Sequence, residues 1–400
     1  MVDVVIAGAG PMGSYAAERL SSKGFHVMVM EEHEQVGYPV HCAGIVSERF
    51  LEKFHIPEDI VQNRLTRFRI FAPHGRIVEC PPAIRAAVVD RRKLDEYYAG
   101  LARQAGALFS LSSRVIQVDQ DSDKVYVRAR EGGEEKTITA KLCILATGSM
   151  SNLPFRCGID RPHFYSNSFQ VEAVIEGLEG VELYLGNDFA PGSFAYAVSV
   201  NSATSKIGIM VRKRLKQCFD NLVGSPYLEG RIVRLEKKRE FRRIPLGFPE
   251  SSQNGRICAL GDAAGQLKTT TGGGIYYGLL SAGILAETIV SSRKSGDFDT
   301  RALGSYDRKW KRVIGKELRM GLLFRRFIEY LSDDDFDAIF SILQKKDLLD
   351  VVEREGDFDF HQHLVLSLLK EREFHRVVYG LLHRGIRRLF QRRKKNLHAA

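Results

Sequence analysis

The sequence predicts an α/β fold, α+β overall, in which a parallel-sheet domain is interrupted by an antiparallel sheet and followed by a helical region. Three short motifs, far apart in the chain, predict it. They are Gly8-Ala9-Gly10-Pro11-Met12-Gly13, Ala146-Thr147-Gly148 and Gly261-Asp262-Ala263-Ala264-Gly265. Each motif alone is a weak signal. In this order they indicate that distant segments return to one site and hold one long ligand there.

The first motif lies between a strand and a helix. Val2–Ala7 has the apolar, β-branched composition of a buried parallel strand, and Ser14–Lys23 reads as a helix closed by Gly24. Val27–Met30 is a second strand, ended by Glu31. This order of strand, glycine turn, helix, strand and acid is the layout of a dinucleotide-binding site.

Each residue of this layout has a physical reason. Gly8 allows the tight turn, Gly10 lets the backbone approach a pyrophosphate, and Gly13 lets the helix pack on the strand. The helix N-terminus offers free N–H groups and a positive dipole end to phosphates. Glu31 can accept both ribose hydroxyls, which favours FAD or NAD over NADP. The alternative is a glycine turn in an ordinary α/β protein.

The two later motifs indicate that the ligand is FAD. Ala146-Thr147-Gly148 ends the strand Leu142–Ala146, and its small residues let the backbone lie against a nucleotide. Asp262 follows the strand Arg256–Leu260, where it can accept a hydrogen bond from the ribitol of FAD or act only as a helix N-cap. Gly272, Gly273 and Gly274 precede a long apolar helix. Their N–H groups can stabilise negative charge on the N1–C2=O region of a reduced flavin, or they form a flexible hinge.

The remaining elements follow from periodicity and turn residues. Strands are expected at Arg67–Phe71, Ile77–Cys80, Val115–Asp119, Lys124–Arg130 and Lys136–Ala140, helices at Arg92–Ala105 and Gly273–Ser291, an antiparallel sheet over 164–243 and helices from 302 onward. We expect an FAD-binding domain of residues 1–66, 86–154 and 255–298. Residues 67–85 and 155–254 form the expected substrate domain, and 299–400 the expected helical region with a basic tail.

Composition indicates where in the cell the protein works. No secretory signal precedes the first strand, and the longest apolar run, Ile275–Val290, contains Glu287. The six cysteines show no metal-ligand spacing, so we expect no metal, no disulfide and a cytoplasmic location.

The net charge of +10 is concentrated in the tail, where Arg384, Arg387, Arg388, Arg392, Arg393, Lys394 and Lys395 supply +7. Such a tail suits an anionic membrane surface, as a peripheral protein on the inner face of the membrane, or is simply solvated. No recognition fold for nucleic acid accompanies the charge.

Taken together, these motifs resemble those of the geranylgeranyl reductase family, which belongs to the p-hydroxybenzoate-hydroxylase-like flavoproteins. The resemblance includes the archaeal digeranylgeranylglycerophospholipid reductase-like members of that family. The matching segments are Gly8–Gly13, Glu31, Gly37–Cys42, Asp90-Arg91 with Leu94-Asp95, Ala146–Gly148, Ile244–Gly247, Gly261–Gly274, Leu331–Asp337 and Glu355–Asp359. The resemblance implies a glutathione-reductase-type FAD domain with an inserted substrate domain. It also implies flavin-dependent saturation of C=C bonds in a prenylated lipid or isoprenoid.

The resemblance also suggests catalytic residues. Reduction of an unactivated C=C bond needs a hydride at one carbon and a proton at the other, and a positioned acid must supply the proton. Cys42 or His41 can do so, or Cys42 can merely shape the pocket. Arg91 resembles a flavin-contacting arginine of the family. The alternative for Arg91 is a surface ion pair with Asp95, four residues on.

One segment departs from the family. An aromatic-x-Trp-x-Phe-Pro segment usually faces the substrate, but here the matching stretch runs from Phe194 to Ser199, with Tyr196 in place of the tryptophan. Phe194 and Tyr196 either line an apolar substrate pocket or pack in the core.

Two other functions remain open. A monooxygenase or halogenase of the same fold is one, although a halogenase would be expected to show a second, Lys-bearing or Trp-rich motif. A flavoprotein that relays electrons to a quinone is the other. No second Gly-x-Gly-x-x-Gly marks a nicotinamide site, so the electron donor is ferredoxin, a deazaflavin or transiently bound NAD(P)H.

Overall fold

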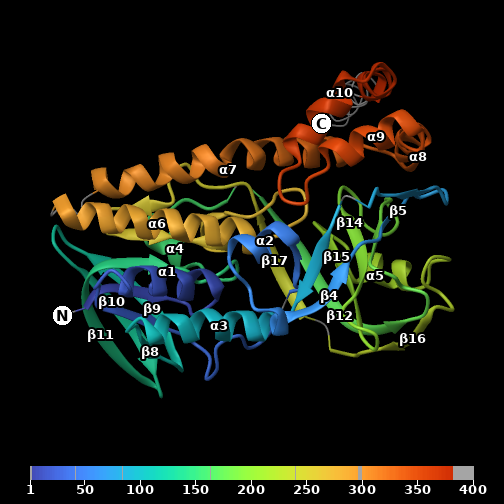
Figure 1. The fold of residues 1–400 in the computed structure, drawn as a ribbon. Helices are drawn as coiled ribbons and strands as arrows, with labels where there is room; N and C mark the ends of the chain where they lie inside the picture. Colours follow the sequence, from blue (N-terminus) through green and yellow to red (C-terminus); the bar gives the residue numbers. More distant parts are fainter. Residues whose placement is uncertain are drawn as a thin grey trace, which may run out of the picture. The chain divides into compact units, whose positions relative to one another are not determined.

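The computed structural model describes residues 2–40, 42–82, 84–162, 164–238, 240–295 and 300–381, which form two compact units (Figure 1). The first unit comprises residues 2–61, 89–166 and 242–319, and the second 62–88, 167–241 and 320–381. The expected helical region beyond residue 299 is thus shared, because helix α7 (Thr300–Ile328) runs from one unit into the other. His41 and the basic tail lie outside the described residues.

The first unit is built on an open sheet in the order β18-β19-β11-β1-β2-β8. Its central pairs are parallel, with Val4 opposite both Leu142 and Val27. Its elements are β1 (Val2–Ala7), α1 (Pro11–Ser21), β2 (Val27–Met30), β3 (Ile45–Ser47), α2 (Glu48–Lys53), η1 (Glu58–Ile60), α3 (Arg91–Gln104), β8 (Leu108–Ser110), β9 (Ser113–Gln120), β10 (Val125–Glu131), β11 (Glu134–Leu145), α4 (Leu153–Arg156), β18 (Gln253–Asn254), β19 (Ile257–Ala259), η2 (Gly261–Ala264) and α6 (Ile275–Ser295). Val4, Val5 and Ile6 are fully buried, as an apolar run in a sheet covered on both faces should be.

Strand β11 corrects the sequence prediction. Lys136–Ala140 and Leu142–Ala146 were expected as two strands, but Glu134–Leu145 is a single one. Its first half pairs with β10 antiparallel, and its second half pairs with β1 and β19 parallel. Ala140 lies opposite both Val125 and Val2, so one continuous strand joins the meander to the parallel sheet.

The second unit contains a sheet in the order β16-β12-β15-β14-β13-β5-β6, with β17 beside β12. It is mostly antiparallel as expected, except that β5 and β13 pair parallel. The elements here are β4 (Val61–Leu65), β5 (Phe68–Phe71), β6 (Ile77–Glu79), β7 (Ala86–Val89), β12 (Phe164–Ile175), β13 (Val181–Tyr184), β14 (Phe194–Ser199), β15 (Ser205–Val211), α5 (Leu215–Val223), β16 (Ile232–Leu235), β17 (Glu240–Leu246), α8 (Asp333–Leu343), α9 (Lys346–Glu355) and α10 (Gln362–Lys370). Of these, β4, β7, β12 and β17 each have residues in the first unit as well.

Helix α6 is the described helix whose length and composition would allow it to cross a membrane, over Ile275–Arg293. Most of that span, 67%, is buried inside the protein, where α6 packs on α1 and η2. A buried core helix passes the same test, so this observation is weak evidence for a membrane span.

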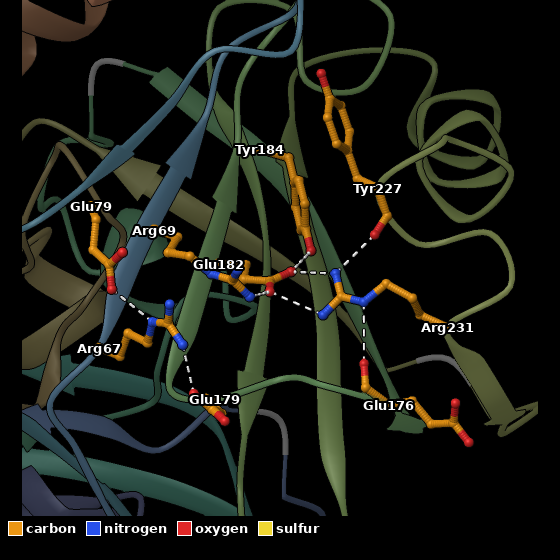
Figure 2. Close-up of polar contacts among 9 residues, drawn as sticks. All are labelled: Arg67, Arg69, Glu79, Glu176, Glu179, Glu182, Tyr184, Tyr227 and Arg231. Atoms are coloured by element: carbon orange, nitrogen blue, oxygen red, sulfur yellow. Dashed lines mark hydrogen bonds and ion pairs between the residues drawn. The ribbon is translucent and has the colours of Figure 1, made fainter. Parts of the chain in front are cut away.

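A charged cluster is buried in the second unit. The Glu182 side chain on β13 is fully buried and accepts hydrogen bonds from Arg231, Arg69 and Tyr184 (Figure 2). The two Arg231 contacts measure 2.9 and 3.0 Å. Burial alone would raise the pKa of Glu182, but these donors and both guanidinium charges outweigh it and hold the pKa below its ordinary value.

We therefore expect Glu182→Ala to destabilise the second unit. Removing one partner leaves buried guanidinium charge uncompensated, which costs about 3 kcal/mol in comparable buried pairs. Glu179→Ala is the matched control, because the Glu179 side chain is 70% exposed where it pairs with Arg67, and such surface pairs contribute at most about 1 kcal/mol. Urea unfolding would measure both. Equal losses in the two variants would contradict the assignment.

The same cluster predicts a pH dependence. Because the folded-state pKa of Glu182 is lowered, its contribution is fully present above the unfolded value of about 4.3. It is then lost as the pH falls through the folded value. Stability of the wild type should therefore fall more steeply in this acidic range than that of Glu182→Gln.

Candidate active site

Two glycines of the first motif allow backbone approaches that no side chain permits. A Cβ on Gly8, whose φ is +107°, would lie 2.4 Å from the Ala146 carbonyl oxygen. A Cβ on Gly13 would lie 2.1 Å from the Gly8 carbonyl oxygen. The first motif and Ala146–Gly148 are therefore in direct contact, at the carboxyl ends of β1 and β11.

Gly10 is a glycine for a different reason. Its φ of −62° and ψ of 175° are open to any residue, and a Cβ there would meet nothing within 4 Å. Gly10 is the N-cap of α1, and Pro11 occupies the first turn, which carries no acid. The open space in front of a helix N-terminus fits the predicted pyrophosphate, which a side chain at residue 10 would displace.

Glu31 is buried at the end of β2, only 8% exposed. One carboxylate oxygen accepts a hydrogen bond from the Ala9 backbone N–H at 2.8 Å. The other accepts from the backbone N–H of His33 at 3.1 Å and lies 2.6 Å from its Nδ1. Glu31 thus binds the glycine turn directly. The sequence analysis missed His33, whose only signal is its place two residues after the acid.

The second motif leaves a polar atom without a partner. The Ala146 N–H donates to the Ala7 carbonyl at 2.9 Å, and Gly148 has a φ of +67°. The Thr147 hydroxyl oxygen is buried and has no hydrogen-bond partner among the described residues. A buried unpaired hydroxyl beside a glycine turn is what a site built for a polar ligand leaves behind.

The third motif lies against the first. A Cβ on Gly261 would lie 3.2 Å from Cγ of Met12, in the first turn of α1. Burial raises the pKa of Asp262, and the charges of Arg91 and Arg242 oppose that shift. A Cβ on Gly274 would lie 2.6 Å from the Asp262 carboxylate, so the carboxylate and the glycine turn before α6 are neighbours.

That glycine turn is held by hydrogen bonds. The Lys268 N–H donates to the Gly273 carbonyl at 3.0 Å, and the Gly272 N–H donates to the Lys268 carbonyl at 2.7 Å. The Gly278 N–H then donates to Gly274 at 2.8 Å, which starts the ladder of α6.

Two residues that the sequence analysis missed hold the Asp262 turn. The fully buried Gln266 accepts the Gly261 N–H at 2.8 Å and donates to the Tyr306 hydroxyl at 2.7 Å. Tyr306 belongs to α7, so this helix supports the third motif from behind. Neither residue lies in a recognisable motif, which is why pattern reasoning did not find them.

Cys42, Arg91 and Asp95 form a cluster. Arg91 opens α3 and binds Asp95 through Nη2, at 3.0 and 3.2 Å. The expected pair with Asp95 therefore exists but is not on the surface, because the two side chains are 17% and 10% exposed. Contact of Arg91 with a flavin stays a prediction. Burial opposes the charge on Arg91, yet Asp95 and a hydrogen bond with Cys42 hold its pKa above the ordinary value.

Cys42 is partly buried, and its sulfur accepts the Gly44 N–H at 3.4 Å. Arg91 also lies close enough to Asp262 to influence the pKa of that carboxyl. The structure thus brings Cys42, Arg91 and Asp262 together, whereas the sequence indicated them only one by one.

Phe194 and Tyr196 lie in the second unit, on β14, with ring centroids 6.4 Å apart. The Tyr196 ring covers Gly208 of β15, where a Cβ would meet it at 2.1 Å, and its hydroxyl donates to Gln170 Oε1 at 3.1 Å. Packing on the sheet accounts for Tyr196, and substrate contact stays a prediction.

A pocket in the first unit joins the second and third motifs. Gly148, Asp262 and Ala263 line it from the motif side. Asn152, Phe155 and Arg161 line it from the segment after β11, and the Arg161 guanidinium lies 4.2 Å from the Phe155 ring centroid.

Gly10→Val should produce a folded apoprotein. Its backbone angles suit valine and the side chain meets only open space, so the loss should fall on FAD and not on stability. Gly100→Val on α3 is the matched control, because a Cβ there is equally unobstructed. Flavin absorbance and thermal unfolding would measure both. Full FAD content in Gly10→Val would show that the first motif is not the pyrophosphate site.

Comparison with known proteins places the chain in a family. Residues 2–179 match the pyridine nucleotide-disulphide oxidoreductase family. The chain is 31% identical to digeranylgeranylglycerophospholipid reductase 2 of Methanothermobacter thermautotrophicus, over 86% of this chain and 92% of the relative. It is 30% identical to digeranylgeranylglycerophospholipid reductase of Methanocaldococcus jannaschii, over 84% and 89%.

Among solved structures, a geranylgeranyl bacteriochlorophyll reductase-like protein from Thermoplasma acidophilum has a TM-score of 0.81 at 22% identity, over 95% of this chain and 98% of that one. A p-nitrophenol 4-monooxygenase from Pseudomonas putida has a TM-score of 0.71 at 17% identity, over 93% and 99%. These likenesses confirm the predicted flavoprotein fold. The sequence relationship goes further, and the chain belongs to the digeranylgeranylglycerophospholipid reductase family of FAD-dependent oxidoreductases.

Proposed function

We propose that the chain is an FAD-dependent reductase that saturates C=C bonds of geranylgeranyl-type chains in an isoprenoid or membrane lipid. The observation that carries the proposal is the meeting of three flavin motifs with the buried Cys42–Arg91–Asp95 cluster in one unit. The relatives, named for reduction of a digeranylgeranyl glycerophospholipid, support the substrate class.

The residues present fit FAD. We assign the pyrophosphate to Gly8, Gly10, Gly13 and the α1 N-terminus, and the adenosine ribose to Glu31. Ala146, Thr147 and Gly148 would lie along the nucleotide, and Asp262, Gly273, Gly274 and Arg91 would face the ribitol and flavin. When bound and reduced, FAD supplies a hydride to one carbon of the double bond.

Cys42 supplies the proton to the other carbon. The Cys42 side chain is held by a hydrogen bond with Arg91 and by the Gly44 N–H at 3.4 Å. A thiol whose position is fixed by two such contacts can act as a positioned acid. His41 is the alternative donor, and it lies outside the described residues.

The proposal also covers the substrate pocket, the electron donor and the membrane. Phe194 and Tyr196 are proposed to line the pocket for the prenyl chain. Ferredoxin, a deazaflavin and NAD(P)H are the candidate donors. The basic tail is proposed to bring the protein to an anionic membrane surface, and it too lies outside the described residues.

The product of the reaction distinguishes this function from its rivals. With FAD reduced by dithionite without oxygen, a geranylgeranyl glycerol ether should gain two mass units per double bond saturated, as measured by mass spectrometry. A product with added oxygen or halogen would favour a monooxygenase or halogenase. Quinone reduction without any saturated product would favour an electron relay.

Cys42→Ala should keep FAD and slow turnover by about 10²–10⁴-fold, the usual contribution of a positioned acid. Substrate affinity should change little, because the proton is used in the transition state and not in the ground state. Cys80→Ala, at another free and partly buried cysteine, is the control. Wild-type turnover in Cys42→Ala would assign the proton to His41 or to water.

A further inference from the structure

Helix α7 carries a concentrated positive charge that the flavin site does not use. Over Thr300–Ile328 it has nine Lys and Arg residues against two acids, Asp307 and Glu317. Both acids are buried, 9% and 8% exposed, so they point into the protein. Positive charge is therefore concentrated on this helix as well as in the tail, because the described part of the helix exposes only positive charge.

The exposed bases of the first-unit part of α7 form one stripe. Arg308, Arg312, Lys316 and Arg319 follow one another at spacings of four, four and three residues, which places them on one side of a helix. Arg301 and Lys309 are exposed beside them. We call these six residues the basic face. It spans about 27 Å at the 1.5 Å rise of a helix.

The opposite side of this part of α7 is buried in the first unit. Leu303, Tyr306, Trp310, Ile314 and Leu318 are at most 1% exposed. Lys309 Nζ contacts Thr288 of α6 at 3.3 Å, and Figure 1 shows α6 and α7 side by side. A helix that binds in a lipid interface buries its apolar side in the membrane, whereas here that side is already used. The basic face instead suits a water-soluble partner of opposite charge.

The basic face also lies directly behind the proposed flavin site. The Thr269 hydroxyl, in the segment that leads to the glycine turn, donates to the Leu318 carbonyl of α7 at 2.9 Å. Lys316 and Arg319 are on the outward side of the same turn of helix. A partner docked there would be separated from the glycine turn by about one helix diameter, some 10–12 Å.

We infer that the basic face is the docking surface for an acidic one-electron carrier protein that reduces the enzyme. The inference rests on the proposed function, since saturating one C=C bond consumes two electrons and two protons. Two carriers, docking in turn, would each be oxidised by one electron. Both protons come ultimately from solvent, one of them through Cys42, which solvent then reprotonates. Charge complementarity of this kind speeds a weak, short-lived encounter without a large interface.

The acids near this face do not cancel it. Lys311, on the flank of the helix, contacts the Glu250 carbonyl, and the Glu250 side chain is exposed there. Glu287 is exposed on α6, next to the Thr288 that Lys309 contacts. Neither glutamate belongs to α7, and the exposed charges of the described part of this helix are all positive.

The test compares two triple charge reversals. Arg308→Glu/Arg312→Glu/Lys316→Glu reverses the basic face. Lys23→Glu/Lys53→Glu/Arg128→Glu makes the same change in net charge at exposed positions elsewhere in the first unit. Stopped-flow absorbance would follow flavin reduction in the FAD-loaded protein by a pre-reduced, acidic ferredoxin without oxygen. Circular dichroism would confirm that all three proteins are folded.

We expect the basic-face variant to lose about 10–10³-fold in the second-order rate constant, the range by which electrostatic steering raises association. The control variant should stay close to the wild type. The wild-type rate should fall with salt, and that dependence should flatten in the basic-face variant. Saturation of the prenyl lipid driven by dithionite should be the same in all three proteins.

Several outcomes would overturn the inference. Equal rates in the two variants would make the effect one of net charge alone. A basic-face variant that keeps its ferredoxin rate but no longer floats with anionic phosphatidylglycerol vesicles would assign the face to a membrane. Rapid reduction of the wild type by NAD(P)H or a deazaflavin, with none by ferredoxin, would also refute it. Failure of the dithionite-driven reaction in every protein would instead count against the proposed function.

Discussion

The proposed flavin site depends on two backbone contacts that are too close for any side chain. Gly8 lies against the Ala146 carbonyl and Gly13 against the Gly8 carbonyl, at distances where a Cβ would lie 2.4 and 2.1 Å from oxygen. These contacts fix helix α1 on the ends of β1 and β11, and so fix the direction in which its N-terminus points. Everything else in the site is positioned relative to this crossing, because Glu31 binds Ala9 and Gly261 packs on Met12.

Helix α7 shows how the site is supported from outside the dinucleotide-binding fold. The Gly261 N–H is held by Gln266, and Gln266 is held by Tyr306. Trp310 donates to Ser252 and Asp307, and so ties the same helix to the segment that precedes β19. A fully buried polar network of this kind is stable only when every member is satisfied. The first part of α7 is therefore structurally part of the flavin-binding unit, although the sequence analysis grouped it with the C-terminal region.

The sequence predicted those parts of the site that follow from local chemistry. Glycine spacing and strand composition located β1, β2 and the turn between them, because a turn that tight allows few residues. The i,i+4 spacing predicted the Arg91–Asp95 pair, but not that it is buried or joined to Cys42. Burial depends on contacts between segments far apart in the chain, and one sequence carries no information on these. For the same reason Gln266 and Tyr306 were missed, and β11 was divided at the point where it changes partners.

Arg91 links the residues that are proposed to face the flavin to the residue that is proposed to donate the proton. Arg91 interacts with Asp95, Cys42 and Asp262, so one guanidinium faces three groups that can carry negative charge. Burial raises the pKa of both Asp95 and Asp262 and opposes any further negative charge. Asp95, Cys42 and Asp262 therefore share one cation, and in the proposed function both cofactor binding and proton donation depend on Arg91.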